Sequence, residues 1–542
     1  MTSTKHSGRV TRRFLHLGGI AAAISLAGPA AASTDLGHGI TMNHLVNLTY
    51  SAAVRVDSPD EDLLANVNGD DGNRNFDDGS LINNRIAALG ELNFRRGDYG
   101  VFLRGSAFYD QAYRSRNDND SPGTVNKDGD HREFTPEAKR FLGRRARMLD
   151  AYAYGTWYIG DTSLDVRAGD QVVSWGESLF FPNMSGAQAP ADATRSNVPG
   201  TEVKDVLLPI GQIYAQWGLT SRISIAAYYQ YEWEGTELNP AGGYFSTTDI
   251  LGPGASRLIV QLPSPPSPVA RVDVPRGADI TPGNSGQWGV STKLLLGGVS
   301  ELGVYHIRYH DKAPLTAVFN NPDFVSLVSG NSSYQFVYVD GIHMSGLSLT
   351  TDVGGAALAS ELSFRQDAGL AVNAPGLAGA PSPAPTRGDV WQANLSATQI
   401  ILPTRFWDQL TLLGEASWLK VDRYDRIEDS GSGQTFDELS NGREAAAYQA
   451  LAQFTYKQVL SGWDFTLSLI HAQLVKGKSP IAGALGSLTG ERDKRYSVGL
   501  GFKYLNNLEL QTAYNGFHGS PDVSDRPLAD RSYVSFSAKY SF

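Results

Sequence analysis

The connections between the predicted strands of this chain alternate in length, and this order constrains the fold more than any other feature. Short turns such as 96–98 and 506–507 follow one strand, and long loops such as 111–147 and 233–286 follow the next. In an outer-membrane β-barrel the periplasmic turns are short and the external loops are long. A soluble β-sandwich or β-helix, the alternative, has no reason to sort its connections in this way. The sequence therefore favours a membrane barrel.

The strands themselves show the two-residue period of a half-buried β-strand. In the first, apolar residues from Val46 to Val56 alternate with mostly polar ones, and in a later strand Glu361, Ser363 and Arg365 share a polar face that we expect inside the barrel. We predict an all-β fold, a transmembrane antiparallel β-barrel of about 18 strands (range about 14–18) with long extracellular loops. The predicted strands are 45–56, 81–94, 99–110, 148–159, 163–173, 211–218, 222–232, 287–296, 301–310, 342–352, 356–365, 390–402, 406–420, 444–456, 463–475, 496–503, 508–515 and 531–542.

Aromatic residues support a barrel that spans a membrane. Eight of the nine tryptophans lie in predicted strands or near their ends, as in the aromatic girdles of outer-membrane barrels. Beyond the N-terminal region, no apolar run approaches the roughly 18 residues that a spanning helix needs. The last strand carries apolar residues on one face up to Phe542. It resembles the terminal strand that the barrel-assembly machinery recognises, so we expect that machinery as a partner.

Residues 1–32 have the features of a signal peptide. Lys5, Arg9, Arg12 and Arg13 precede the apolar run 17–27, and three alanines end at Ala32. We expect cleavage after Ala32 and export by the general secretory route rather than the twin-arginine route. The mature barrel then comprises residues 33–542, in the outer membrane of a Gram-negative bacterium.

The long connection 174–210 differs from the other loops. It mixes aromatic residues, several prolines and charges of both signs, without a helical or strand period. A barrel of this size holds an aqueous channel unless something fills it, so we expect this connection to fold into the lumen; display on the surface is the alternative. The apolar residues of the loop either contact substrate or only pack against the wall, and the charged ones are available to bind charges of the lumen. The predicted lumen and substrate-path residues are Trp175, Glu177, Phe180, Phe181, Met184, Glu202 and Lys204.

The chain shows few signs of catalysis. It has no cysteine and no Gly-x-Ser-x-Gly, His-Glu-x-x-His or phosphate-binding glycine motif, so we expect neither an enzyme nor a cofactor. The formal net charge of −10 disfavours a nucleic-acid partner.

Two groups of charged or polar residues allow ligand binding. The oxygen-rich loop 66–78 is a weak calcium candidate through Asp70, Asn73 and Asp77, although a solvated acidic turn is the favoured interpretation. The cluster 144–147 contains three arginines that either pair with lipopolysaccharide phosphates or are solvated. Outer-membrane lipid and lipopolysaccharide are the expected surroundings.

Several motifs resemble one large proteobacterial family of outer-membrane proteins, long catalogued only as a domain of unknown function. They are Gln-Val-Val-Ser-Trp-Gly-Glu-Ser at 171–178, Leu-Asp-Ala-Tyr at 149–152 and Tyr-Phe-Ser-Thr-Thr-Asp at 244–249. Asp170 departs from the family, which usually has arginine there. The resemblance implies outer-membrane passage of hydrophobic small molecules, such as a sterol, alkane, fatty acid or related lipid, and a periplasmic lipid carrier as a partner.

Other functions stay open at this point. A general porin for hydrophilic solutes is the main alternative, and it predicts a constriction lined by opposed charges. A surface adhesin would use its loops alone, and an outer-membrane lipid enzyme would need a reactive serine and histidine at the wall.

Overall fold

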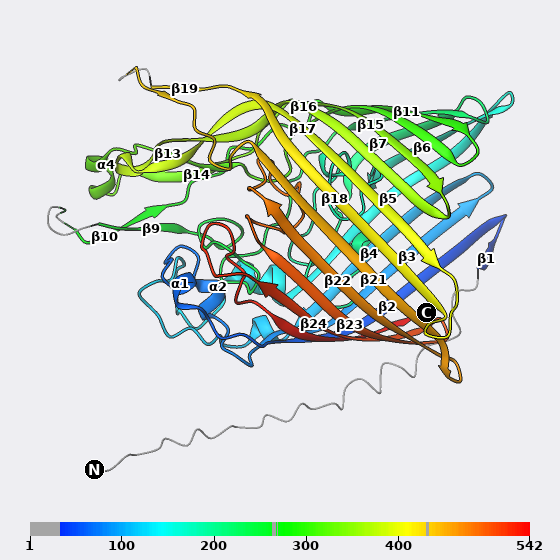
Figure 1. Ribbon diagram of the computed structural model, residues 1–542, viewed down its shortest axis with the longest axis horizontal. Coiled ribbons are helices and arrows are strands. Elements are labelled where there is room, and N and C mark those ends of the chain that lie inside the picture. Colours follow the sequence, from blue (N-terminus) through cyan, green and yellow to red (C-terminus); the bar gives the residue numbers. More distant parts are fainter. Residues whose placement is uncertain (1–32, 263–266, 268, 430–432) are drawn as a thin grey trace, which may run out of the picture.

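The computed structural model describes residues 33–262, 267, 269–429 and 433–542, and the predicted signal peptide lies outside them. These residues form a closed antiparallel barrel of 18 strands, because the first long strand pairs with both its successor and the last strand (Figure 1). In ring order the strands are β2 (Ile40–Arg55), β3 (Leu81–Arg96), β4 (Tyr99–Asp110), β5 (Arg144–Ile159), β6 (Thr162–Gln171), β7 (Ile210–Gly218), β8 (Ile223–Gln230), β11 (Gln287–Gly297), β12 (Ser300–Tyr309), β15 (Ile342–Val353), β16 (Ala356–Pro375), β17 (Pro381–Ile401), β18 (Gln409–Tyr424), β21 (Glu444–Leu460), β22 (Trp463–Lys476), β23 (Lys494–Tyr504), β24 (Leu508–His518) and β25 (Tyr533–Ser541).

The predicted fold is confirmed, since each predicted strand overlaps one strand of the ring. The largest difference is the β16–β17 hairpin, which continues to Pro375 and Pro381 where we predicted a loop over 366–389. Prolines at 381, 383 and 385 lie in this extension, although proline cannot donate to a ladder. They occupy alternate positions, so the strand can present the remaining N–H groups to its partner.

Smaller elements lie in the long loops, which project from one end of the barrel, at the left of Figure 1. They include the hairpins β9 (Arg257–Gln261) with β10 (Arg271–Pro275), β13 (Thr316–Asn320) with β14 (Ser333–Val337), and β19 (Ile427–Glu428) with β20 (Thr435–Phe436). The helices α1 (Glu61–Leu64), α2 (Asp71–Arg74), α3 (Pro136–Ala138) and α4 (Phe324–Val328) are short. Strand β1 (Thr34–Gly37) pairs with β2 at the opposite, short-turn end. Within the described ranges, no helix is long and apolar enough to cross a membrane.

The barrel is polar inside and apolar outside. On β16, Glu361 and Arg365 are each 3% exposed, whereas Leu362 between them is 41% exposed. The predicted polar face therefore does point inward. The same alternation places Gln392 inside and Leu395 outside on β17. This arrangement is the reverse of a soluble protein and suits an outer surface in contact with lipid.

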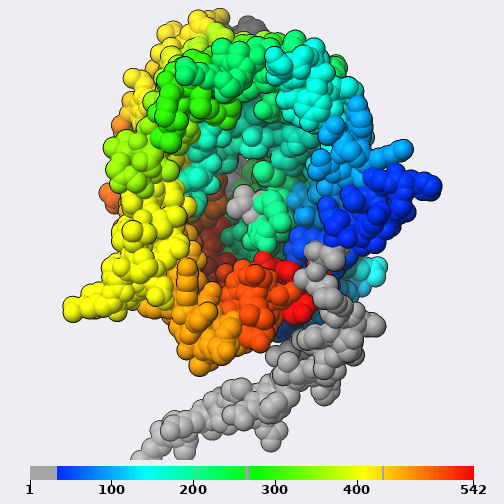
Figure 2. Space-filling view, turned by 90° about the vertical axis from the view of Figure 1, so that its right-hand side faces the viewer, coloured from blue at the N-terminus to red at the C-terminus, as the bar shows by residue number. Residues whose placement is uncertain are grey.

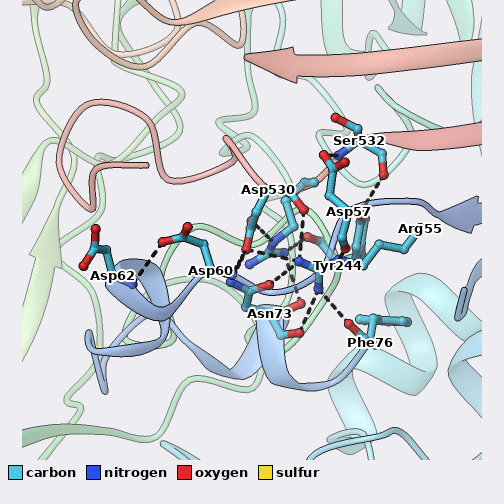
Figure 3. A network of polar contacts seen from close by, with 11 residues as sticks. Arg55, Asp57, Asp60, Asp62, Asn73, Phe76, Tyr244, Asp530 and Ser532 are labelled. Carbon is cyan, nitrogen blue, oxygen red and sulfur yellow. Dashed lines mark hydrogen bonds and ion pairs between the residues drawn. The ribbon is translucent and has the colours of Figure 1, made fainter. Parts of the chain in front are cut away.

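The long loops fold together into a cap at one mouth of the barrel. Its polar centre is Arg55, at the end of β2, whose fully buried guanidinium donates to Asn73 Oδ1 (2.7 Å) and to the carbonyl of Phe76 (2.6 Å) (Figure 3). The same group forms an ion pair with Asp530 Oδ2 at 3.1 Å. Around it lies an apolar cluster that includes Phe76, Tyr113, Phe134, Tyr244 and Phe517. Residues from both ends of the chain thus stabilise one packed cap.

Candidate functional site

The connection between β6 and β7, residues 172–209, enters the barrel, and we call it the lumen segment. Figure 2 views the barrel from the short-turn end. Blue-green atoms, the colour of this part of the chain, occupy part of the hollow enclosed by the strands. The predicted bounds were 174–210; Ile210 is the first residue of β7.

Two wall carboxylates hold the first part of the lumen segment. Glu361 on β16 accepts backbone hydrogen bonds from Glu177 and, at 2.7 Å, from Ser178. Glu415 on β18 accepts from the backbone of Phe180 and, at 2.9 Å, of Phe181. Strand β18 is eight strands round the ring from β6, counting β7, β8, β11, β12, β15, β16, β17 and β18. The segment therefore reaches nearly the opposite wall.

Side-chain amides of the wall and the segment extend this attachment. Asn394 donates to the carbonyl of Phe181 at 2.7 Å. Ser363 donates to Asn183 Oδ1 at 2.5 Å, and Arg365 donates to the carbonyl of Asn183 at 3.3 Å. All of these groups are buried, so these wall side chains bond to the segment rather than to solvent.

The second part of the segment returns across the lumen. Gln230 on β8 donates to the carbonyl of Gln188 at 2.6 Å. Near its end, the segment contacts the closing strands, where Gly200 lies so close to Ser537 and Thr49 that an added Cβ would be 3.2 Å from each. The segment thus contacts the wall on several sides.

Ion pairs lie toward the short-turn end. Lys539 on β25 pairs with Glu202 at 2.7 Å, and Lys204 lies 3.3 Å from Glu202. On another side, Lys293 on β11 lies 3.4 Å from Glu177. The three charged residues that we singled out therefore face charged partners inside the barrel.

The apolar residues of the segment pack against the wall. Trp175 lies 4.9 Å from the ring of Tyr228 and belongs to the same buried cluster as Met184. Phe181 is 2% exposed in a second cluster, with Phe180 packed against it. Met184 sits over Gly346, where an added Cβ would lie 2.5 Å from its sulfur. The contact of these side chains with substrate stays a prediction.

A small cavity opens at the long-loop mouth beside the first of these clusters. Its volume is about 130 Å³, and its lining combines the apolar Leu315, Leu370, Leu439 and Pro383 with the polar Thr316, Ser440 and Asn441. Leu370 belongs to the cluster that contains Trp175, and Leu315 and Leu439 pack against it. Apolar side chains therefore continue from the cavity to the lumen segment.

The other predicted charged groups have internal partners. Arg145 pairs with Glu237, and Arg147 pairs with both Glu237 (3.0 Å) and Asp192. Two arginines of the 144–147 cluster thus bind the loops and the lumen segment.

The three calcium candidates have different surroundings. Asn73 belongs to the Arg55 network and donates to Asp530 Oδ2 at 2.6 Å. Asp77 is partly exposed, and its backbone N–H donates to Asp118 at 3.2 Å. Asp70 is buried beside Asp71 and Asp249. Only Asp70 of the predicted three lies in this carboxylate group.

Sequence reasoning missed the anchoring role of Glu361 and overlooked Glu415 altogether. The available signal was a carboxylate on the inward, polar face of a strand, and this does not reveal its partner. The partners are backbone amides about 180–235 positions earlier in the chain.

The family model described as "Protein of unknown function (DUF1302)" matches residues 13–542. This chain belongs to the DUF1302 family. The resemblance noted in the sequence is thereby confirmed. No curated protein matches this DUF1302 member.

Several solved structures are similar in fold to this DUF1302 protein. OccAB4 of Acinetobacter baumannii is 11% identical, with a TM-score of 0.43 over 94% of this chain and 98% of that one. OccAB2 of the same organism is 10% identical, with a TM-score of 0.40 over 92% and 98% of the two chains. OccK11 (OpdR) of Pseudomonas aeruginosa is 9% identical, with a TM-score of 0.40 over 92% and 96%.

Proposed function

We propose that this protein lets hydrophobic small molecules, such as a sterol, alkane, fatty acid or related lipid, cross the outer membrane of a Gram-negative bacterium through its barrel. The observation that carries the proposal is the lumen segment, which is attached to nearly opposite walls and is continuous with apolar side chains at the loop mouth. Attached in this way, the segment narrows the aqueous path through the barrel.

The substrate class rests on the apolar route. The cavity at the mouth, lined in part by Leu315 and Leu439, adjoins the cluster that holds Trp175 and Met184. Along such a route, apolar surface of the molecule that would otherwise face water is buried, which is favourable by about 25 cal/mol for each Å². The family resemblance supports the same class of substrate and a periplasmic carrier that receives it.

The second candidate is a channel for hydrophilic solutes. It is favoured by the opposed charges near the short-turn end, where Lys539 and Lys293 face Glu202 and Glu177. Rows of opposed charge are what a constriction for polar solutes requires. These charges are paired with the lumen segment itself, which is why we prefer the first candidate.

The two candidates are separated by reconstituting the protein in liposomes. We would measure entry of a fluorescent fatty acid and a fluorescent sterol, and in parallel the swelling caused by sugars and amino acids. The variant has 178–203 replaced by a short Gly/Ser linker, and empty liposomes are the control. We expect the native protein to pass the lipid probes but not the sugars, and the variant to admit sugars. Rapid sugar entry through the native protein would favour the hydrophilic channel instead.

A further inference from the structure

Two long loops bring three buried carboxylates together inside the cap. Asp70 and Asp71 come from the loop after β2, and Asp249 comes from the loop after β8. Each can offer one oxygen such that the three oxygens lie within 4.8 Å of one another. The exposed fractions of the three residues are 0%, 1% and 0%, so solvent does not screen them.

The contacts of these residues leave oxygen atoms without partners. The backbone N–H of Asp71 donates to Asp249 Oδ2 at 2.9 Å, and the backbone N–H of Asn126, from a third loop, donates to Asp71 Oδ2 at 3.2 Å. Each of the three carboxylates keeps a buried Oδ1 that meets no donor in the described part of the chain. The side-chain Oδ1 of Asn126 is buried and unpartnered in the same way. The three unsatisfied carboxylate oxygens, which lie close together, call for a cation or for protons.

The charges nearby do not balance the carboxylates. Arg74 forms an ion pair with Asp70 alone. Lys127 donates instead to the backbone carbonyls of Asp130 and Glu133. Burial raises the pKa of Asp71 to about 7, and it raises the pKa of Asp249 as well. Without a further positive charge, the group is stable only if it binds protons.

We propose that Asp70, Asp71 and Asp249 bind one calcium ion, which joins the loops that form the cap. Calcium binds oxygen ligands at 2.3–2.6 Å and accepts six to eight of them in flexible geometry. Oxygens within 4.8 Å of one another fit around such an ion. Magnesium usually keeps several waters, whereas the free oxygens here are buried. The inference concerns the cap and does not depend on what passes through the barrel.

The test measures calcium directly on the full barrel, refolded in detergent free of lipopolysaccharide, because lipopolysaccharide itself binds calcium. Protein equilibrated with calcium is passed over a desalting column and its calcium content measured, and its affinity is determined by titration calorimetry. We expect about one calcium per chain. The variant Asp71→Asn with Asp249→Asn should bind at least about 10-fold more weakly, since it loses two of three anionic ligands. Asp62→Asn, at an exposed residue of the same loop, is the matched control and should bind like the native protein.

A second readout follows the cap itself. Limited proteolysis of the 111–143 loop should be at least about 10-fold slower in calcium than in EGTA for the native protein and for the control. For the double variant, the rates in calcium and in EGTA should agree, whether or not its cap is intact. Native protein that binds no calcium at pH 8 and is cleaved equally fast in calcium and EGTA would overturn the proposal and leave shared protons as the balancing charge.

Discussion

Removing the two wall carboxylates that hold the lumen segment should open the channel. The variant is Glu361→Ala with Glu415→Ala. These side chains are each 3% exposed and together accept four backbone hydrogen bonds from the segment. The alanines keep the strands but leave the four N–H groups without acceptors.

The size of the effect follows from these four bonds. A hydrogen bond to a charged acceptor contributes about 1.5 kcal/mol at the lower end of the usual range, so four contribute about 6 kcal/mol. Water can reach the freed amides once the segment moves, so we take half of this sum, about 3 kcal/mol, as the net loss of attachment free energy. Each 1.4 kcal/mol is a factor of about 10 in population, so the displaced segment should become about 100-fold more populated.

Single-channel recording in a planar bilayer measures this population as the fraction of time spent open. We expect the native protein to be nearly silent and the double alanine variant to be open about 100-fold more often. Glu361→Gln with Glu415→Gln keeps an acceptor oxygen at each site, so it should have a smaller effect. Glu61→Ala with Glu428→Ala makes the same change in net charge at exposed residues and should have none. The reasoning fails if the alanine variant is as silent as the native protein, or if the native protein already conducts like an open porin.

Three further outcomes test the cap and the closing strand. Arg55→Met removes one of the two arginines that pair with the buried carboxylate of Asp530. Because Arg531 remains beside it, we take the lower end of the cost of breaking a buried pair, about 3 kcal/mol. Cleavage of the loops should become about 100-fold faster, whereas Arg96→Met at an exposed position should leave the rate unchanged. The pKa of Asp71 rises from 3.8 to about 7 on folding, so the folded cap favours the protonated carboxyl. The calcium-free cap should therefore lose stability as pH rises from about 4 to 7, by on the order of 4 kcal/mol. Hydrogen exchange of the cap at pH 5 and pH 8 in EGTA measures this change, and faster exchange at pH 5, after correction for the intrinsic rate, would contradict it. Deleting Phe542 should lower the fraction of heat-modifiable barrel assembled in cells, and unchanged assembly would argue against recognition of the last strand.

The ring of strands was predictable from the sequence because each strand carries its own evidence. Period-two alternation is local, and the inward row with Glu361 and Arg365 could be assigned without knowing what lies opposite. The extended β16–β17 hairpin was not predictable, since its prolines are tolerated only at alternate positions that the register selects.

The contacts within the site depend on chain folding over long distances, and this limited the prediction. Arg55 and Asp530 are 475 positions apart, and no local pattern marks either as the partner of the other. The loop 66–78 was recognised as rich in oxygen ligands, but Asp249 and Asn126 come from other loops. The entry of 174–210 into the lumen could be inferred from its composition, whereas its anchors could not.

The attachment of the lumen segment has a consequence for how such proteins can diverge. Glu361 and Glu415 bind main-chain amides, which every residue except proline possesses. These backbone bonds therefore do not depend on the side chains at 177, 178, 180 and 181 and exclude only proline there, whereas the packing of Phe181 restricts its replacement separately. Pro182 stands at the first position after these four, where its backbone has no such bond to make. A scaffold held in this manner allows selection to alter what the channel recognises without first having to rebuild its obstruction.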